Sequence, residues 1–422
     1  MGTTSLSALM LAAGRRLRAV TQVTTTANSS STTTATATTL ANYFSADDAP
    51  NLAYWVRLPS GADNTNTTAE ERKVSDYVAS TGVVTVSSAW TTDADNRVDS
   101  GKALQMWRLD PDIVRQACLE AIRELSPTIL HAWVRDESLF VDNLLTNSTF
   151  ETFSSTFTGW SNIGTPTLAQ STRTVHGTYS ASIAATGAVE GIEQNILTSI
   201  NLVDAVGKTL HVRGWTWDDA ASSSRLRVTF DGSTYTNGTY NTGDGEWNGP
   251  STQYINVAIP ADLTEATVSC EVASGETGLF KNVAAWVDGY RIYRYTIPST
   301  IRTLHNVYVQ AREDQPNGLY VPLAGRPASG RILRLEGRAA LTAPSADAST
   351  TEVDGDRAEL LVLHAARSVS RMVEQFKDRA EALEDAYLAH LTRPGVKMTA
   401  PGAQAHDFWR VDPSGPALVL TS

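Results

Sequence analysis

The sequence is poor in cysteine, in long apolar runs and in positive charge, and each shortage excludes a class of protein. Its two cysteines, Cys118 and Cys270, lie in a predicted helix and a predicted strand, so we expect no disulfide and no metal or redox motif. No apolar run approaches the ~20 residues of a membrane span, so no membrane partner is expected. A net charge of −11 argues against specific nucleic-acid recognition, which needs clustered Lys and Arg.

Catalytic motifs are lacking as well. There is no G-x-S-x-G, Walker loop, H-E-x-x-H or dinucleotide-binding glycine cluster, and the seven histidines are scattered without ligand spacing. The carboxylates of Asp136-Glu137 and Asp218-Asp219 are sequence neighbours that point different ways, so neither pair suits glycoside hydrolysis. We therefore expect a protein that is not an enzyme.

Three segments with helical periodicity are present. Helices are expected over residues 4–20, 111–130 and 354–391. The first carries its arginines after its apolar stretch, the reverse of the order in a signal peptide, so we interpret it as a helix. Because amphipathic helices depend on packing of their apolar faces, we expect the three to form one bundle.

Between the first two helices lies a β region, expected over residues 40–107. It follows a Ser- and Thr-rich stretch that is either an extended arm or a weakly patterned strand. Within it, RKVSDYVASTGVVTVSSAW (residues 72–90) alternates apolar and polar residues around a glycine-containing turn, which predicts a β-hairpin.

The hairpin resembles one that recurs in structural proteins of tailed bacteriophages. The resemblance is carried by Arg72, Val74, Tyr77, Thr81, Gly82, Val84, Val86 and Trp90. Residues 333–391 resemble the close of a phage neck or head-to-tail adaptor protein, in which a strand pair leads into an acidic turn and a final long helix. The resemblance implies a homo-oligomeric ring that contacts portal and tail or neck proteins, in a virion assembled in the host cytoplasm.

A different pattern occupies the middle of the chain. Short alternating runs, separated by Gly, Asn, Asp and Ser, follow one another from about Leu144 to Tyr295 and predict a β-sandwich or jelly roll. Three motifs in order resemble carbohydrate-binding-module-like jelly rolls. They are Asn147–Glu151 with Gly159-Trp160, then Val175–Ala181, and finally Val287–Ile292.

The predicted fold class is α+β and multidomain, with a helical bundle, a small β-hairpin domain and an inserted all-β jelly-roll sandwich. The expected boundaries are 1–142 for the first part of the adaptor domain, 143–296 for the insert, 297–393 for the second part and 394–422 for a C-terminal arm. Arms and tails of this kind suit contacts between ring subunits, because disordered segments can wrap a neighbour as they order.

The resemblance to carbohydrate-binding modules implies two kinds of site. Many such modules hold one structural calcium through an opening Glu, a closing Asp and backbone carbonyls, and Glu151 and Asp288 match those positions. The alternative is that both are polar groups at strand ends.

A glycan site would use aromatic rings flanked by polar side chains. The candidates are Trp215, Trp217, Tyr235, Tyr240 and Trp247, with Tyr254 also considered and Asp218, Asp231, Asn237 and Asp244 nearby in sequence. Core packing is the alternative for Trp215 and Trp217, whereas Tyr235, Tyr240 and Trp247 lie in or beside a polar loop.

Three functions remain as hypotheses. The first is a structural virion protein, a head-to-tail adaptor ring subunit that displays a jelly roll able to bind host surface glycans. The second is a glycan-binding adhesion protein of the phage tail tip or fibre, although no long β-repeats are visible. The third and weakest is a secreted polysaccharide-active enzyme.

Overall fold

The structure, a computed structural model, divides into two compact units. It describes residues 2–29, 31–44, 54–59, 69–91, 98–126, 128–175, 177–200, 202–220, 223–312, 319–392 and 419–421. The first unit comprises the described residues of 1–133 and 338–403, and the second those of 134–337 and 404–422. The predicted insert, 143–296, lies within the second unit, and its exact boundaries stay a prediction. Most of the predicted arm, 394–422, lies outside the described residues.

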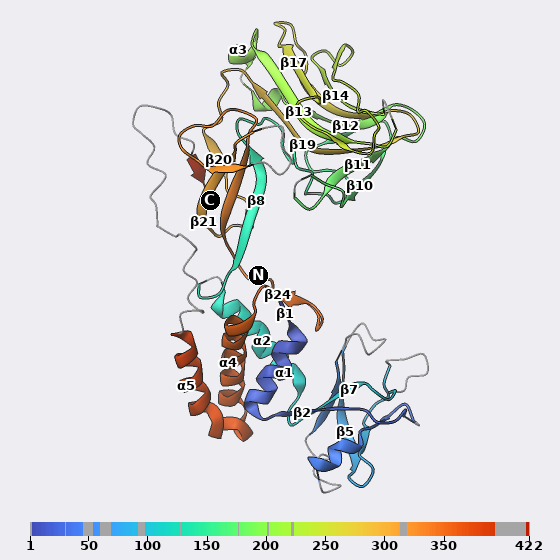
Figure 1. Cartoon of the computed structure of the whole chain (residues 1–422), viewed down its shortest axis with the longest axis vertical. Coiled ribbons are helices and arrows are strands. Elements are labelled where there is room, and N and C mark those ends of the chain that lie inside the picture. The colour runs from blue at the N-terminus through green and yellow to red at the C-terminus, as the bar shows by residue number, and fades with distance from the viewer. Residues whose placement is uncertain are drawn as a thin grey trace. The chain divides into compact units, whose positions relative to one another are not determined.

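The first unit contains a six-stranded antiparallel sheet (Figure 1). Its order is β2 (Val20–Thr24), β7 (Ala103–Trp107), β4 (Trp55–Leu58), β5 (Glu70–Val78), β6 (Val83–Val86) and β3 (Thr34–Thr36), with a 3-10 helix η1 (Thr38–Asn42) after β3. The predicted hairpin is confirmed as β5–β6, which buries Tyr77 and Trp90 in the core. Its turn needs Gly82 (φ 65°), because an added Cβ would lie 2.3 Å from the Ala37 carbonyl oxygen.

Four helices of the first unit pack around α4, which contacts each of the other three (Figure 1). They are α1 (Leu6–Leu17), α2 (Pro111–Leu125), α4 (Gly355–Met372) and α5 (Ala380–Leu391), and the short strands β1 (Thr4–Ser5) and β24 (Thr350–Thr351) pair beside them. The helix predicted over 354–391 is interrupted. Val373 is extended (φ −103°, ψ 113°) and a 3-10 helix η3 (Glu374–Arg379) follows it, so the chain turns and α5 packs against α4.

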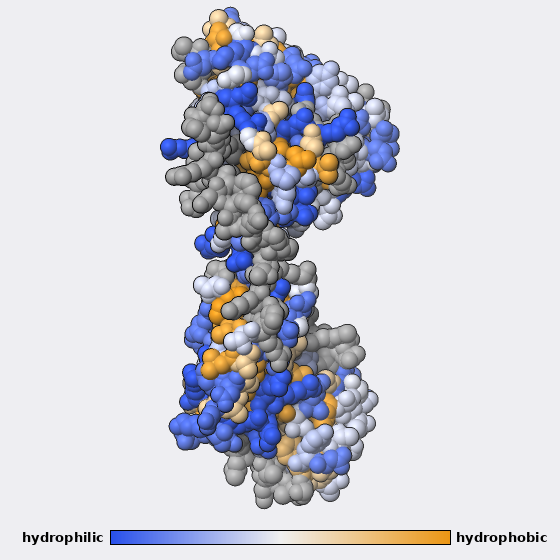
Figure 2. Space-filling model, turned by 60° about the vertical axis from the view of Figure 1, so that its left-hand side comes forward, coloured by the Kyte–Doolittle hydropathy of each residue, from blue (hydrophilic) through white to orange (hydrophobic). Residues whose placement is uncertain are grey.

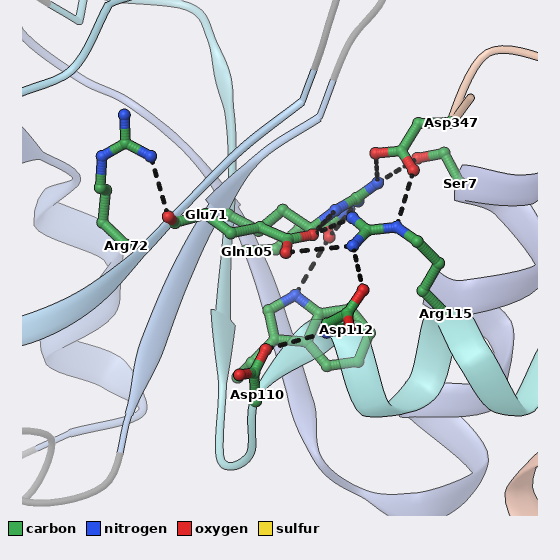
Figure 3. A network of polar contacts seen from close by, with 10 residues as sticks. Ser7, Glu71, Arg72, Gln105, Asp110, Asp112, Arg115 and Asp347 are labelled. Atoms are coloured by element: carbon green, nitrogen blue, oxygen red, sulfur yellow. Dashed lines mark hydrogen bonds and ion pairs between the residues drawn. The ribbon is translucent and has the colours of Figure 1, made fainter. Parts of the chain in front are cut away.

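A network of ion pairs connects this sheet to the helices, and Figure 3 shows Glu71, Arg115 and Asp347 pointing toward one another within it. Arg57 on β4 is fully buried and donates to Glu71 Oε1 on β5 (3.1 Å) and Gln105 Oε1 on β7 (2.9 Å), and it also pairs with Asp347. Arg115 on α2 pairs with both Glu71 and Asp347. A buried charge is tolerated only when it is paired, so these contacts set how the helices dock on the sheet.

The second unit is built around a β-sandwich of two antiparallel sheets (Figure 1). One sheet has the order β10 (Thr167–Ser171), β11 (Ser180–Ala184), β19 (Thr277–Val287), β13 (Thr209–Trp217) and β16 (Trp247–Asn248), with β17 (Tyr254–Ala258) also on β13. The other has the order β15 (Tyr235–Asn237), β14 (Ser224–Thr229), β18 (Thr267–Val272), β12 (Glu190–Asn195) and β9 (Ser161–Ile163). Apolar residues of both inner faces form one core, which the jelly-roll prediction required.

A third sheet covers part of the outer face of β19. Its order is β22 (Tyr320–Pro322), β21 (Thr303–Gln310), β23 (Ile332–Ala339) and β8 (Ala132–Phe140). Phe140 and Ile332 pack on Ala284 and Trp286 of β19. Short elements complete the unit: η2 (Leu197–Ser199), α3 (Leu202–Ala205), and β20 (Arg294–Thr296) paired in parallel with β25 (Val419–Thr421).

A fully buried carboxylate, that of Asp142, lies where the chain passes from β8 into the sandwich. It accepts hydrogen bonds from the Ile292 backbone (2.9 Å) and Arg326 (2.7 Å), and it also binds Arg291 and Ser329. The Tyr295 hydroxyl accepts from the Asp142 backbone (2.7 Å), and burial raises the pKa of Tyr295 to about 12, so this phenol stays protonated at neutral pH. The segments that enter and leave the sandwich therefore meet at Asp142.

The fold class expected from the sequence is wrong. Strands make up 37% of the structure and helices 21%, and a helical bundle core is not seen in the residues that the structure describes. The hydrophobic clusters that lie within the sheets and between them are built mainly from strand residues. The reason is that residues 20–107, in which short β-branched runs carry only a weak signal, supply a whole six-stranded sheet, whereas long helical periods are easy to detect.

The surface is mostly hydrophilic on the face drawn in Figure 2, where hydrophobic residues form only small patches. Within the described part of the chain, no helix has the length and apolarity needed to cross a bilayer. Cys118 and Cys270 are both buried and free.

The buried carboxylate generates a stability prediction. Asp142→Ala leaves the Ile292 N–H and two guanidiniums without their shared acceptor, so we expect a loss of about 3 kcal/mol in the unfolding free energy of the second unit. Asp288→Ala is the control, because its carboxylate is 62% exposed and its pairing is worth at most about 1 kcal/mol. Scanning calorimetry of both variants measures their unfolding temperatures. Equal unfolding temperatures for Asp142→Ala and Asp288→Ala would contradict the prediction.

Candidate functional site

The outer face of the five-stranded sheet gathers charged, polar and aromatic side chains. Leu226 and Val228 of β14 point into the core, so the alternating residues Arg225 and Arg227 point outward. Strand register places further residues on the same side. We name this surface the arginine face, and its members are Arg225, Arg227, Thr229, Thr267, Ser269, Glu271, Glu193, Tyr235 and Asn237, together with Tyr240, which stacks on it.

A buried carboxylate holds the two arginines. Arg225 lies opposite Glu271 on β18 and contacts its Oε1 through Nε (2.7 Å) and a terminal nitrogen (2.6 Å), and Arg227 pairs with the other oxygen. Glu271 is 2% exposed, so its charge is compensated almost entirely by the two guanidiniums. These contacts fix both guanidinium groups on the sheet.

Each arginine also stacks on a tyrosine. The Arg227 guanidinium lies 3.5 Å from the Tyr235 ring centroid, and that of Arg225 lies 4.3 Å from the Tyr240 ring centroid. Tyr235 is 37% exposed and Tyr240 is partly exposed, so the rings also face solvent. The result is two guanidinium–aromatic stacks that share one carboxylate.

The arginine face has perturbed ionisation. Burial lowers the pKa of Arg227, and the neighbouring Arg225 charge lowers it further. Burial raises the pKa of Glu193, and the nearby Glu265 charge adds to that shift. Ser269 Oγ, opposite Arg227, is buried and has no hydrogen-bond partner among the residues that the structure describes.

The structure divides the five aromatic residues predicted to bind glycan. Tyr235 and Tyr240 lie on the arginine face. Trp217 and Trp247 are register partners on the other sheet, where the Arg173 guanidinium lies 3.9 Å from the Trp217 ring centroid. Trp215 is 5% exposed and packs closely on Gly249, which favours the core-packing alternative for this residue.

The polar residues expected near a glycan site have mostly local partners. Asp231 accepts from the backbone N–H groups of Ser233 and Thr234, which lowers the pKa of its carboxyl, and Asp244 accepts from Thr242 and Glu246. These are turn-stabilising contacts. Burial raises the pKa of Asp218, which accepts from Ser224.

The structure does not bring together the two carboxylates predicted to bind calcium. Glu151 contacts Lys281 inside β19, whereas Asp288 follows the end of that strand and lies 2.9 Å from His211 Nε2. Lys281 and Asp288 are separated by roughly 20 Å of extended chain. The part of the chain that the structure describes holds no group of three or more His, Cys, Asp or Glu suited to a metal.

A lysine ammonium already fills the oxygen cluster around Glu151. Lys281 Nζ donates to Glu151 Oε1 (2.6 Å), the Thr149 carbonyl (2.6 Å) and the Tyr179 carbonyl (2.5 Å). A carboxylate with backbone carbonyls is the donor set that calcium prefers, but here a 1% exposed side-chain cation takes its place. These residues therefore do not fit a calcium ion while Lys281 is present.

The candidate site residues that the sequence did not reveal are the charged ones. Arg225, Arg227 and Glu271 were not predicted, although the alternation in RLRVTF (residues 225–230) places both arginines on one face. Their common partner lies on β18, which is more than 40 residues further along the chain. Only the sheet order reveals that pairing.

The lysine contacts generate a prediction on metal dependence. We expect EDTA to leave the melting temperature unchanged, because Lys281 supplies the positive charge that the oxygens require. Lys281→Met should cost about 3 kcal/mol, since Glu151 and two carbonyls lose their common donor. Lys208→Met is the control for loss of a lysine charge, and thermal unfolding with and without EDTA is the measurement. A drop of the wild-type midpoint in EDTA would contradict the prediction.

Comparisons with known proteins cover only part of the chain. The sequence matches no protein-family model and no curated protein. Among solved structures, the chain is similar to the enzymatically active domain of tailspike protein 4 of bacteriophage CBA120, at 12% identity over 35% of this chain and 21% of that chain (TM-score 0.28).

Two carbohydrate-binding modules are also similar to it. One is the CBM22-1 xylan-binding domain of Paenibacillus barcinonensis Xyn10C, at 15% identity over 35% of this chain and 96% of that chain (TM-score 0.28). The other is TmCBM61 in complex with β-1,4-galactotriose, at 20% identity over 35% of this chain and 99% of that chain (TM-score 0.26). TM-scores this low carry no argument about the function of this chain.

Proposed function

We propose that the arginine face binds a glycan. The observation that carries the proposal is the pair of guanidinium–tyrosine stacks held by one buried carboxylate, because it places flat aromatic surface beside fixed charged donors on a solvent-facing sheet. A sugar ring presents C–H groups on its faces and hydroxyl groups at its rim. Tyrosine rings can pack on the C–H groups, and charged donors and acceptors can hydrogen-bond to the hydroxyl groups.

The contacts around Glu271 support this proposal through preorganisation. The Glu271 carboxylate holds Arg225 and Arg227 in place before any ligand arrives, so a ligand need not restrict two long side chains. Immobilising such side chains costs about 0.5 to 1.5 kcal/mol each on binding. Asn237 and Glu193, at the two sides of the arginines, supply further polar groups.

The proposal is for binding without hydrolysis. Glycoside hydrolysis requires two carboxyl groups, one protonated and one ionised, flanking the scissile bond. Glu271 cannot serve as either, because both of its oxygens are engaged by guanidiniums and the side chain is buried. Glu193 remains as a polar contact beside Arg227.

Substitutions on the two sheets test the position of the site. Tyr235→Ala with Tyr240→Ala should weaken binding at least tenfold, since each aromatic contact is worth about 0.5 to 1.5 kcal/mol beyond its area. Trp217→Ala removes an aromatic residue from the other sheet and should leave affinity unchanged. A glycan array with the full chain identifies the ligand, and titration calorimetry then compares the variants.

Two outcomes would contradict the glycan-binding proposal. One is an array on which the wild-type chain retains no glycan. The other is a double tyrosine variant that binds as tightly as wild type while Trp217→Ala does not.

We also propose that the chain is a structural virion protein of a tailed bacteriophage, and more finely a head-to-tail adaptor ring subunit. Its support is the resemblance of the β5–β6 hairpin and of residues 333–391 to such proteins. The hairpin's apolar positions, Val74, Tyr77, Val84, Val86 and Trp90, lie in the core of the six-stranded sheet. An adhesion protein of the tail tip or fibre is the alternative.

The native mass of the full chain distinguishes an adaptor ring from an adhesion protein of the tail tip or fibre. A ring subunit uses heterologous contacts that close on themselves, so we expect one species that is a large multiple of 45.4 kDa. A trimer would favour the adhesion alternative. A monomer at all concentrations would contradict the ring.

A further inference from the structure

An open cleft lies in the second unit, away from the arginine face. Its volume is about 600 Å³, and its described lining is Arg213, Pro250, Ser251, Tyr254, Asn256, Ala311, Arg312 and Arg331. Arg213 and Tyr254 belong to β13 and β17, which are strands of the other sheet of the sandwich, and Arg312 and Arg331 come from segments next to β21 and β23. The sandwich and the third sheet thus form this cleft together.

Positive charge is concentrated among the described lining residues of the cleft. Three of its described lining residues are arginines and none is Asp or Glu, although the chain as a whole has a net charge of −11. Burial lowers the pKa of Arg213, and the charge of Arg331 lowers it further, so the two guanidiniums are close enough to repel each other. An anion placed between them would reduce that repulsion.

Two of the arginines have contacts that hold them in the structure, Arg213 through its side chain and Arg331 through its backbone. The Arg213 guanidinium lies 5.4 Å from the Trp286 ring centroid, and the Arg331 carbonyl accepts from the Val141 backbone (2.9 Å). Tyr254, the register partner of Arg213 on β17, is 46% exposed, and Asn256 and Ser251 offer polar side chains in the same lining. An exposed ring beside amide and hydroxyl groups suits a saccharide, and the arginines suit an anionic substituent on it.

We propose that this cleft is a second binding site, for an acidic saccharide whose carboxylate or sulfate group contacts Arg213, Arg312 and Arg331. The inference deepens the proposed function and rests on it in one respect, namely that the second unit binds glycans. The two sites are separate, because the cleft uses no residue of the arginine face. The cleft selects for charge through the three arginines of its described lining, which includes no Asp or Glu.

Calorimetric titration of the full chain tests the cleft. The probes are an oligogalacturonide, which bears carboxylates, a heparin oligosaccharide, which bears sulfates as well, and a cello-oligosaccharide of similar length, which is neutral. We expect at least one acidic probe to bind, with affinity that falls as salt rises, and the neutral probe not to bind in the cleft. Arg312→Gln with Arg331→Gln should weaken acidic binding at least tenfold.

Matched variants make the result specific. Arg135→Gln with Arg294→Gln removes the same number of charges from exposed positions of the same unit and should leave binding of the acidic probe unchanged. Tyr235→Ala with Tyr240→Ala should also leave it unchanged, while lowering affinity for any glycan held by the arginine face. The two proposals can therefore fail independently.

Three outcomes would overturn the inference. The first is that neither acidic probe binds. The second is that the cleft variant and the exposed-charge control lose affinity equally, which shows general charge attraction. The third is that the tyrosine variant loses binding of the acidic probe, which assigns that probe to the arginine face. Binding of the oligogalacturonide identifies carboxylate as sufficient, and binding of heparin alone identifies sulfate; either supports the cleft.

Discussion

The buried carboxylate of Asp142 is the constraint on which the second unit depends. It lies where the chain enters the sandwich, and its partners Arg291 and Ile292 lie where the chain leaves it. Asp142 therefore holds the segment that precedes the sandwich next to the segment that follows it. With its two ends held together, the two-sheet sandwich can be inserted between β8 and β21 while these strands stay in one sheet. The same junction lets β8 and β23 cover the outer face of β19, so that one sheet of the sandwich is partly covered while the arginine face stays in solvent.

Buried charges recur in this protein, and each is paired in a way that fixes geometry. Arg57 joins the sheet and the helices of the first unit, Lys281 holds Glu151 and two carbonyls, and Glu271 holds two arginines. An unpaired buried charge destabilises the folded state. A paired one holds its partner in a fixed position, because moving the partner away would leave the charge uncompensated. In the first two cases the result is structural. In the third it is a rigid polar and aromatic surface, which is the property that a glycan-binding face requires.

Alternation and turn residues were sufficient to predict the sandwich and the β5–β6 hairpin, since both depend on local patterns of period two. The same patterns missed the six-stranded sheet as a whole, whose strands are short and whose order depends on contacts between distant segments. Motif matching placed Glu151 and Asp288 in one calcium site. The structure separates them, because Glu151 meets Lys281 far from the end of β19, and no spacing in the sequence reveals that an ammonium group fills the oxygen cluster.

The sequence by itself determined that two aromatic residues, Tyr235 and Tyr240, belong to a polar and exposed part of a β-domain, because composition and alternation are local properties. Only the tertiary structure decided that they share a face with Arg225, Arg227 and Glu271, while Trp217 and Trp247 lie on the other sheet and Trp215 is buried. The physical reason is that sheet order and register bring together residues tens of positions apart, and they do so through backbone hydrogen bonds that every residue type can make.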